Sequence, residues 1–220
     1  MKKSSLKAYL RKSHQEVSHR KRIEILSDIL ATNMSSLSNH SLWNCLDIGC
    51  GDMKISSLIS QKASQINFKC IDVFPKPENR IDINWDNYLQ YDGVQIPYEQ
   101  NSFDAAILVD VLHHCTDITG TLNEARRITP YIIVKDHLEY GLVSRTLLQL
   151  MDFYGNWAYD VNVPKRYFSK ESFEKLCKEC GFKILSMQIG INLYKTLPLI
   201  ARITKPEWQF IAVLEREQID

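Results

Sequence analysis

The fold is decided by Leu46-Asp-Ile-Gly-Cys-Gly-Asp52, where an apolar run ends in two glycines that alternate with other residues. Residues 44–49 predict a β-strand, and residues 54–63 predict the helix that follows the turn. Glycine adopts backbone angles that other residues resist, and it lets a ligand approach the main chain closely. The first turn of a helix offers unpaired N–H groups and the positive end of a dipole. The stretch therefore predicts a strand, a tight turn and a helix that together bind a ligand.

Length and composition indicate an ordinary globular chain. Its 220 residues suit one domain with a sizeable core, and 45% hydrophobic with 24% charged residues is typical of such domains. The net charge of +1 gives no overall case for nucleic-acid binding. No apolar run is long enough to span a membrane, and the N-terminus lacks the apolar core of a signal peptide. We therefore expect a cytoplasmic protein with a single domain over residues 1–220.

Positive charge gathers at the N-terminus, where residues 1–22 hold eight Lys or Arg against one acid, Glu16. Residues 1–36 are expected to form an N-terminal helical segment, with amphipathic helices over residues 6–30 and a Ser/Asn-rich connector over residues 33–41. The charge is typical of a solvated helix face. The alternative is attraction to an anionic substrate, a partner or a lipid surface, which the chain would contact peripherally.

Strands and helices alternate along the rest of the chain. Strands are expected at residues 44–49, 66–73, 88–91, 103–109, 131–134, 182–189 and 208–214, and helices at residues 54–63, 119–127 and 170–180. This alternation predicts an α/β fold, a doubly wound seven-stranded, mostly parallel sheet with helices on both faces. Residues 137–168 are too long for a simple connection. They predict a helical lid over the carboxyl ends of the strands, where ligands bind in such sheets.

Two ligands compete for the glycine turn. A nicotinamide dinucleotide and S-adenosylmethionine (SAM) both need an acid after the second strand for the ribose hydroxyls, and Asp72 follows Gly51 by 21 residues. The dinucleotide fingerprint needs Gly or Ala where this chain has Lys54, whose bulk opposes close packing of the helix on the strand. SAM is therefore favoured. A nicotinamide-dependent oxidoreductase is the alternative, as is a non-catalytic nucleotide-binding module that acts through its basic N-terminal helices.

These residues resemble the class I SAM-dependent methyltransferases, in their small-molecule subgroup. The resemblance covers about residues 44–136 and rests on Asp47 with its G-x-G turn, Ile71-Asp72-Val73, Asp92-Gly93, Ile96-Pro97-Tyr98, Asn101-Ser-Phe-Asp104 and Val109-Asp-Val-Leu-His-His114. The usual third glycine of the family is Met53 here. The resemblance implies a Rossmann-like fold and an enzyme that uses SAM and releases S-adenosylhomocysteine.

The resemblance also implies roles for individual residues. The expected cofactor contacts are Asp47, Gly49, Cys50, Gly51, Asp72, Val73, Asp92, Gly93, Asp110 and Val111. Within this set, Asp72 would bind the ribose hydroxyls, Asp92 would meet the adenine amine, and Asp110 would close the methionine end.

The acceptor side of the site follows the fourth and fifth strands. His113 and His137 come after these strands, and each is a candidate base for an acceptor hydroxyl, because imidazole titrates near neutrality. The other expected acceptor contacts are His114, Asp136, Tyr154, Asn156, Trp157 and Tyr167. We expect a small-molecule acceptor, with O-methylation slightly favoured over N- or C-methylation. The chain lacks the Asn/Asp-Pro-Pro-aromatic signature of the amino-methylating nucleic-acid enzymes.

No metal site is expected. His113 and His114 are adjacent, and adjacent side chains are expected to point apart. The six cysteines show no metal or disulfide spacing, and Cys177-Lys-Glu-Cys180 predicts two thiols on a helix rather than a zinc site.

Overall fold

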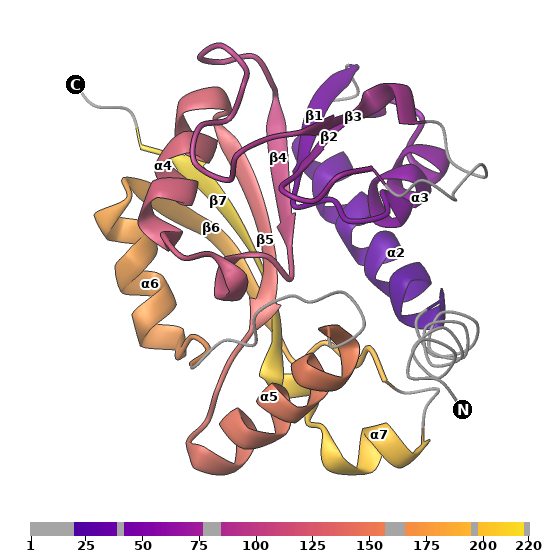
Figure 1. Ribbon diagram of the computed structural model, residues 1–220, viewed down its shortest axis with the longest axis vertical. Helices are drawn as coiled ribbons and strands as arrows, with labels where there is room; N and C mark the ends of the chain where they lie inside the picture. The colour runs from indigo at the N-terminus through magenta and orange to yellow at the C-terminus, as the bar shows by residue number, and fades with distance from the viewer. Residues whose placement is uncertain (1–19, 39–41, 77–84, 157–165, 195–197, 218–220) are drawn as a thin grey trace.

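The computed structural model describes residues 20–38, 42–76, 85–156, 166–194 and 198–217. One seven-stranded sheet runs through it (Figure 1), in the order β3-β2-β1-β4-β5-β7-β6. The strands are β1 (Trp43–Ile48), β2 (Ile66–Asp72), β3 (Tyr88–Gln90), β4 (Ala105–Val109), β5 (Tyr131–His137), β6 (Phe182–Ile189) and β7 (Gln209–Arg216). Strands β1 to β5 are parallel, and β7 is antiparallel to both β5 and β6. The predicted doubly wound, mostly parallel α/β sheet is confirmed.

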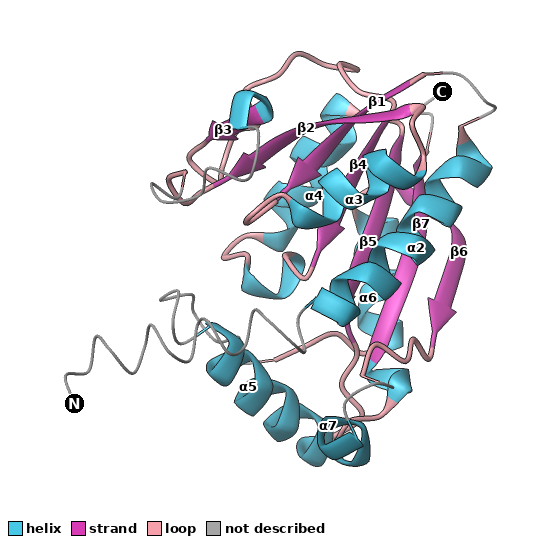
Figure 2. Ribbon diagram, turned by 90° about the vertical axis from the view of Figure 1, so that its right-hand side faces the viewer, coloured by secondary structure: helices cyan, strands magenta, loops and turns pink. Residues whose placement is uncertain are grey.

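Helices cover both faces of the sheet, as Figures 1 and 2 show. The helices are α2 (Arg20–Leu37), α3 (Lys54–Lys62), α4 (Ile118–Ile128), α5 (Leu142–Asn156), α6 (Lys170–Glu179) and α7 (Pro198–Ile203), with short 3-10 turns η2 (Trp85–Asn87), η3 (Leu112–His114) and η4 (Pro206–Trp208). Buried side chains of α2 and α3 form one hydrophobic core with the sheet, and those of α4 and α6 form the other. Alternate residues of β4 enter the two cores, which explains its unbroken apolar sequence.

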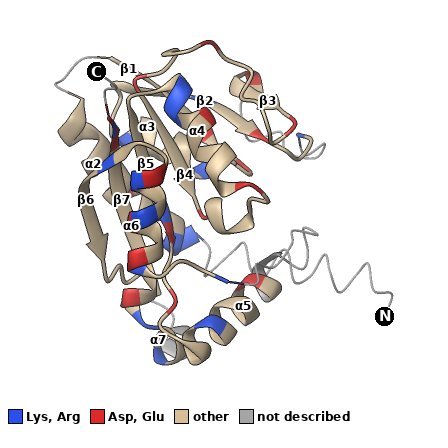
Figure 3. Ribbon diagram, turned by 90° about the vertical axis from the view of Figure 1, so that its left-hand side faces the viewer, with Lys and Arg blue, Asp and Glu red and all other residues tan. Residues whose placement is uncertain are grey.

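Helix α6 shows how the sequence defines such an element. The hydroxyl of Ser169 accepts the backbone N–H of Ser172, and the Ser172 hydroxyl accepts that of Ser169, which forms a capping box. Phe173 and Cys177 are completely buried against the sheet. The opposite face carries alternating charges (Figure 3), including an ion pair between Lys170 and Glu174. Burial raises the pKa of the Cys177 thiol to about 12, as befits a core residue.

Two boundary predictions were wrong, and both failed because polar side chains found partners. The connector expected over residues 33–41 is helical as far as Leu37, because Asn33 bonds back to the Ile29 carbonyl and Met34 is completely buried. Strand β5 was expected to end at Val134 but continues through Lys135, Asp136 and His137, which are all buried. These three residues lie inside the functional site described below.

Helix α5 follows β5, where a helical lid was expected. It lies outside the sheet, beyond the carboxyl end of β5 and next to α7 (Figures 1 and 2). None of the described helices is long and apolar enough to cross a membrane. Residues 1–19, which carry most of the N-terminal basic charge, lie outside the described residues.

Candidate active site

The turn after β1 has the backbone that its glycines predict. Gly49 and Gly51 have φ angles of 73° and 55°, in the left-handed region that favours glycine. A Cβ atom at Gly49 would lie 2.5 Å from Cγ2 of Val111, whereas one at Gly51 would meet no atom within 4 Å. The turn is therefore closed on the Val111 side and open at Gly51. Met53 also has a positive φ, 57°, but its side chain is buried, so the turn forms without the third glycine.

The acid at the end of β2 is fixed directly beside this turn. Oδ2 of Asp72 accepts the backbone N–H of Gly51 over 2.8 Å, and Oδ1 accepts that of Phe74 over 3.0 Å. The backbone N–H groups of Gly49 and Cys50 both donate to the carbonyl of Ile71. Parallel pairing of β1 and β2 thus brings together residues that are 21 positions apart in the chain.

Asp47 lies beneath the turn and is only 3% exposed. Burial raises the pKa of its carboxyl to about 7, against a hydrogen bond from Ser56 that lowers it. The negative charges of Asp72 and Asp52 add to the rise. Asp47 therefore retains its proton at pH values where an exposed aspartate is ionised.

The Asp92-Gly93 turn lies beside the residue that follows β2. A Cβ atom at Gly93, where φ is 79°, would be 2.9 Å from Cγ1 of Val73. Oδ1 of the exposed Asp92 accepts the backbone N–H groups of Val94 and Gln95, and these bonds lower the pKa of the carboxyl. Asp92 thus closes its own turn, in addition to any contact it makes with a ligand.

Asp110 is the centre of a charge network at the carboxyl end of β4. Its carboxylate forms an ion pair with Lys135 of β5, whose side chain is completely buried. Nη2 of Arg22, on helix α2, lies 3.5 Å from Oδ2 of Asp110, and Nη1 of Arg22 lies 3.3 Å from the hydroxyl of Tyr194. Burial opposes ionisation of Asp110, but Lys135, His137 and Arg22 hold its pKa well below the usual range. Arg22 and Lys135 were missed from the sequence.

Two buried imidazoles share the carboxylate of Asp136 next to this network. Nδ1 of His113 lies 2.5 Å from Oδ1 of Asp136, which also accepts the backbone N–H of His137 over 2.7 Å. The rings of His113 and His137 have centroids 5.2 Å apart. Within the part of the chain that the structure describes, Nδ1 of His137 has no hydrogen-bond partner. It lies 3.4 Å from Oδ1 of Asp110 and 3.6 Å from Oδ1 of Asp136.

The pKa values of the two imidazoles are shifted in opposite directions. Burial disfavours the charged ring of His113, but the carboxylates of Asp136 and Asp152 outweigh it and raise the pKa of His113 above its ordinary value. Burial and the positive charge of the neighbouring Lys135 ammonium both lower the pKa of His137. One ring therefore favours the charged form and the other the neutral form at the same edge of the sheet.

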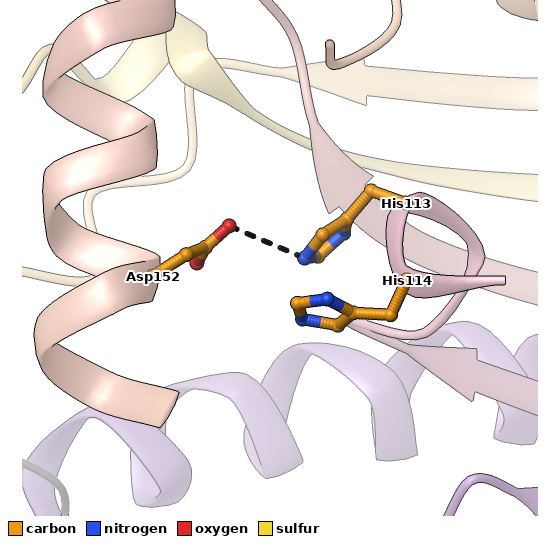
Figure 4. A group of neighbouring side chains, drawn as sticks. All are labelled: His113, His114 and Asp152. Carbon is orange, nitrogen blue, oxygen red and sulfur yellow. Dashed lines mark ion pairs between the residues drawn. The ribbon is translucent and has the colours of Figure 1, made fainter. Parts of the chain in front are cut away.

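Helix α5 brings Asp152 to the same place (Figure 4). Oδ2 of Asp152 lies 3.5 Å from Nε2 of His113 and accepts the hydroxyl of Tyr167. The ring of His114 lies against that of His113, with centroids 4.0 Å apart. The expectation that these adjacent side chains point apart was wrong, because the tight η3 turn places both rings on the side that faces α5.

The remaining expected acceptor contacts have mixed outcomes. Tyr167 is 6% exposed, and its ring lies 5.5 Å from that of His113 and 5.8 Å from that of His137. Tyr154 and Asn156 are in the last turn of α5, where the structure describes the backbone only, and Trp157 lies outside the described residues. Asp152, which was not among the expected site residues, is an acidic residue that α5 contributes to the site.

Comparisons with known proteins show which family this chain matches. A family model described as a methyltransferase domain matches residues 9–187. No curated protein matches the chain. The match favours methyl transfer over the nicotinamide and binding-module alternatives, and with it SAM as the cofactor.

Solved structures share the fold at low identity. A Haloferax volcanii protein described as a methyltransferase, solved with the Trm112 methyltransferase activator, has a TM-score of 0.64 at 13% identity, with 96% of this chain and 97% of that one covered. A SAM-dependent methyltransferase of Methanosarcina mazei has a TM-score of 0.60 at 16% identity, covering 84% and 98%. The [4+2]-cyclase SpnF has 0.62 at 15%, covering 88% and 80%. At such identities the likeness shows the fold alone, and the cyclase shows that this fold serves more than one reaction.

Proposed function

This chain belongs to the methyltransferase domain family, and we propose that it methylates a hydroxyl group of a small-molecule acceptor. SAM supplies a methyl group on a positively charged sulfur, which an acceptor oxygen can displace. The protein must then align the acceptor with that methyl group, exclude water and accept a proton. The proposal is carried by one observation: His113 and His137 share the buried Asp136 carboxylate beside Asp110, at the carboxyl edge of the sheet.

The turn after β1 suits the cofactor, because its open side is at Gly51 and a fixed carboxylate lies next to it. Each oxygen of Asp72 accepts one backbone N–H and keeps a lone pair for a ribose hydroxyl. The proposed cofactor contacts remain Asp47, Gly49, Cys50, Gly51, Asp72, Val73, Asp92, Gly93, Asp110 and Val111. In this arrangement Val73 and Gly93 flank the adenine, and Asp110 with Val111 closes the methionine end.

His137 is the proposed proton acceptor. Its lowered pKa keeps the ring neutral near pH 7, as a base requires. Nδ1 faces the carboxylates of Asp110 and Asp136, so the neutral ring carries its proton there and keeps the lone pair on Nε2. The raised pKa of His113 favours its charged form, which has no free lone pair to accept a proton. His113 is instead held by the carboxylates of Asp136 and Asp152.

The acceptor would lie between the histidines and helix α5. Proposed contacts are His114, Asp136, Tyr154, Asn156, Trp157 and Tyr167, together with Asp152 and Arg22, which the structure brings to the same edge. An acceptor with several hydroxyl groups suits this wall, because carboxylates, imidazoles and a phenol all exchange hydrogen bonds with hydroxyls.

The experiment is to incubate the purified protein with methyl-labelled SAM and a whole-cell extract, and to identify the labelled product by mass spectrometry and NMR. The proposal predicts a new methyl ether of a small molecule. Label on nitrogen or carbon would overturn the hydroxyl acceptor, and label on protein or RNA would overturn the small-molecule acceptor.

A further inference from the structure

His113, His114 and Asp152 form a set of potential metal ligands where η3 faces helix α5 (Figure 4). Each residue offers one nitrogen or oxygen atom, and these atoms all lie within 4.8 Å of one another. His113 is 6% exposed, whereas His114 and Asp152 are half-buried, so the set is partly accessible to solvent. Two imidazoles and a carboxylate are a ligand set that Zn²⁺ and other first-row divalent ions take in proteins.

His113 is oriented as a metal ligand would be. Its Nδ1 lies 2.5 Å from the completely buried Asp136 carboxylate, which leaves Nε2 to face Asp152. Histidines that bind metals usually donate their other ring N–H to a carboxylate in this way, which fixes the ring and raises its basicity. Nε2 of His113 is buried and has no hydrogen-bond partner among the described residues.

The distance between His113 and Asp152 also suits two ligands of one metal ion better than a direct hydrogen bond. Nε2 lies 3.5 Å from Oδ2 of Asp152, beyond the roughly 2.7–3.2 Å of a good N–H···O bond. Ligand atoms at about 2.0–2.1 Å from a tetrahedral ion are about 3.3–3.4 Å apart. The Tyr167 hydroxyl donates to the same Oδ2 atom and so fixes the position of the Asp152 carboxylate.

A second set, His113, Asp136 and His137, fits a metal less well. The short contact between Nδ1 of His113 and Asp136 leaves no room for an ion between them. All three residues are 6% exposed or less, and the Lys135 ammonium acts on His137 from nearby. A cation would therefore meet both steric and electrostatic resistance at this second set.

We propose that His113 Nε2, one ring nitrogen of His114 and the Asp152 carboxylate bind one divalent transition-metal ion, such as Zn²⁺. Three protein ligands leave at least one position for an exchangeable oxygen. This last point rests on the proposed function: an acceptor hydroxyl bound there would lose its proton more readily and lie beside His137.

The test is calorimetry of the chelator-treated full chain with ZnCl₂, with Co²⁺ absorption as a report on the ligands. One ion per chain should bind, and the Co²⁺ spectrum should lack thiolate charge-transfer bands. Asp152→Asn and His114→Ala should each weaken binding by about tenfold or more. Asp28→Asn, at an exposed carboxylate on α2, is the matched control and should bind the ion like the wild type.

SAM calorimetry on each variant reports folding and the cofactor site independently of the metal. Wild-type protein that binds SAM but no Zn²⁺ would overturn the metal site and leave the methyltransferase intact. The same holds if Asp152→Asn binds the ion unchanged, if His137→Gln abolishes binding while His114→Ala does not, or if the cobalt spectrum shows thiolate ligands. Should His114→Ala fail to bind SAM, the isosteric Asp152→Asn variant decides alone.

Discussion

Lys135, completely buried in β5, forms an ion pair with Asp110 at the end of β4. The pair joins the two central strands at the edge where the candidate active site lies, and Arg22 of α2 reaches the same carboxylate. Taking two charges out of water is unfavourable unless they meet each other, so each residue depends on the other for its stability in the fold.

Removing one partner of this pair should therefore be strongly destabilising. Lys135→Met removes the buried ammonium partner of Asp110, and we expect the free energy of unfolding to fall by about 3 kcal/mol. The double variant Lys135→Met/Asp110→Asn removes the unpaired negative charge and should recover part of that loss. Urea unfolding of Lys135→Met, Asp110→Asn and the double variant measures these effects. A double variant that loses the sum of the two single losses would show that the residues are not coupled.

Replacing the two glycines of the turn by alanine should have different effects on stability and on SAM binding. Gly49→Ala places a Cβ atom 2.5 Å from Val111, so we expect a loss of about 1–3 kcal/mol of stability that Val111→Ala partly restores. Gly51→Ala meets no protein atom, and only the left-handed backbone opposes it, by about 1 kcal/mol. Its methyl group enters the open side of the turn, so SAM affinity should fall more than stability does. Thermal unfolding and SAM calorimetry on the same samples separate the two, and the reverse pattern would contradict the account.

Asp47 should make stability depend on pH. Its pKa is raised from 3.8 to about 7 in the folded chain. The stability of the fold is therefore fully retained below pH 3.8, where Asp47 is protonated in both the folded and the unfolded chain, and it falls as the pH rises to about 7. Asp47→Asn keeps the shape of the side chain without its charge, so it should be more stable than the wild type at pH 8. The difference in free energy of unfolding between the variant and the wild type should be about 2 kcal/mol more in favour of the variant at pH 8 than at pH 5. Urea unfolding at the two pH values measures the difference. Equal differences at pH 5 and pH 8 would mean that Asp47 is ionised in both.

His137→Gln should slow methyl transfer without weakening SAM binding. Loss of a general base typically lowers kcat by about 10²–10⁴-fold. Because the pKa of His137 is lowered, the wild-type rate should already be on its plateau at neutral pH and should fall only toward acid. The variant should lack this acid limb. A kcat within about twofold of the wild type would show that another group accepts the proton.

Most of the fold could be predicted because its signals are local. The glycine turn, the apolar β4 strand and the capping box of α6 each define an element within a few residues. The end of β5 could not be predicted in this way. Lys135, Asp136 and His137 look like residues of a surface loop, and only their partners on β4, η3 and α2 make burial favourable.

Some residues of the candidate site could likewise be predicted from a local sequence pattern, whereas others could not. Asp72 was found because the spacing between the glycine turn and the next strand end is itself a sequence pattern. Arg22 lies 88 positions from its partner Asp110, and Asp152 lies 39 positions from its partner His113. Nothing in their local sequence marks them, because their roles come from how α2 and α5 meet the sheet.

The most direct test of the whole account is calorimetry of the purified chain with SAM, for the wild type and for Asp72→Ala. We predict one SAM bound per wild-type chain and an affinity lower by at least about tenfold in Asp72→Ala, since the variant loses a charged hydrogen-bonding group at the ribose. Asp28→Ala, at an exposed carboxylate far from the glycine turn in sequence, should bind SAM like the wild type. A folded wild-type protein that gives no heat with SAM, or an Asp72→Ala variant that binds it equally well, would contradict the central claim.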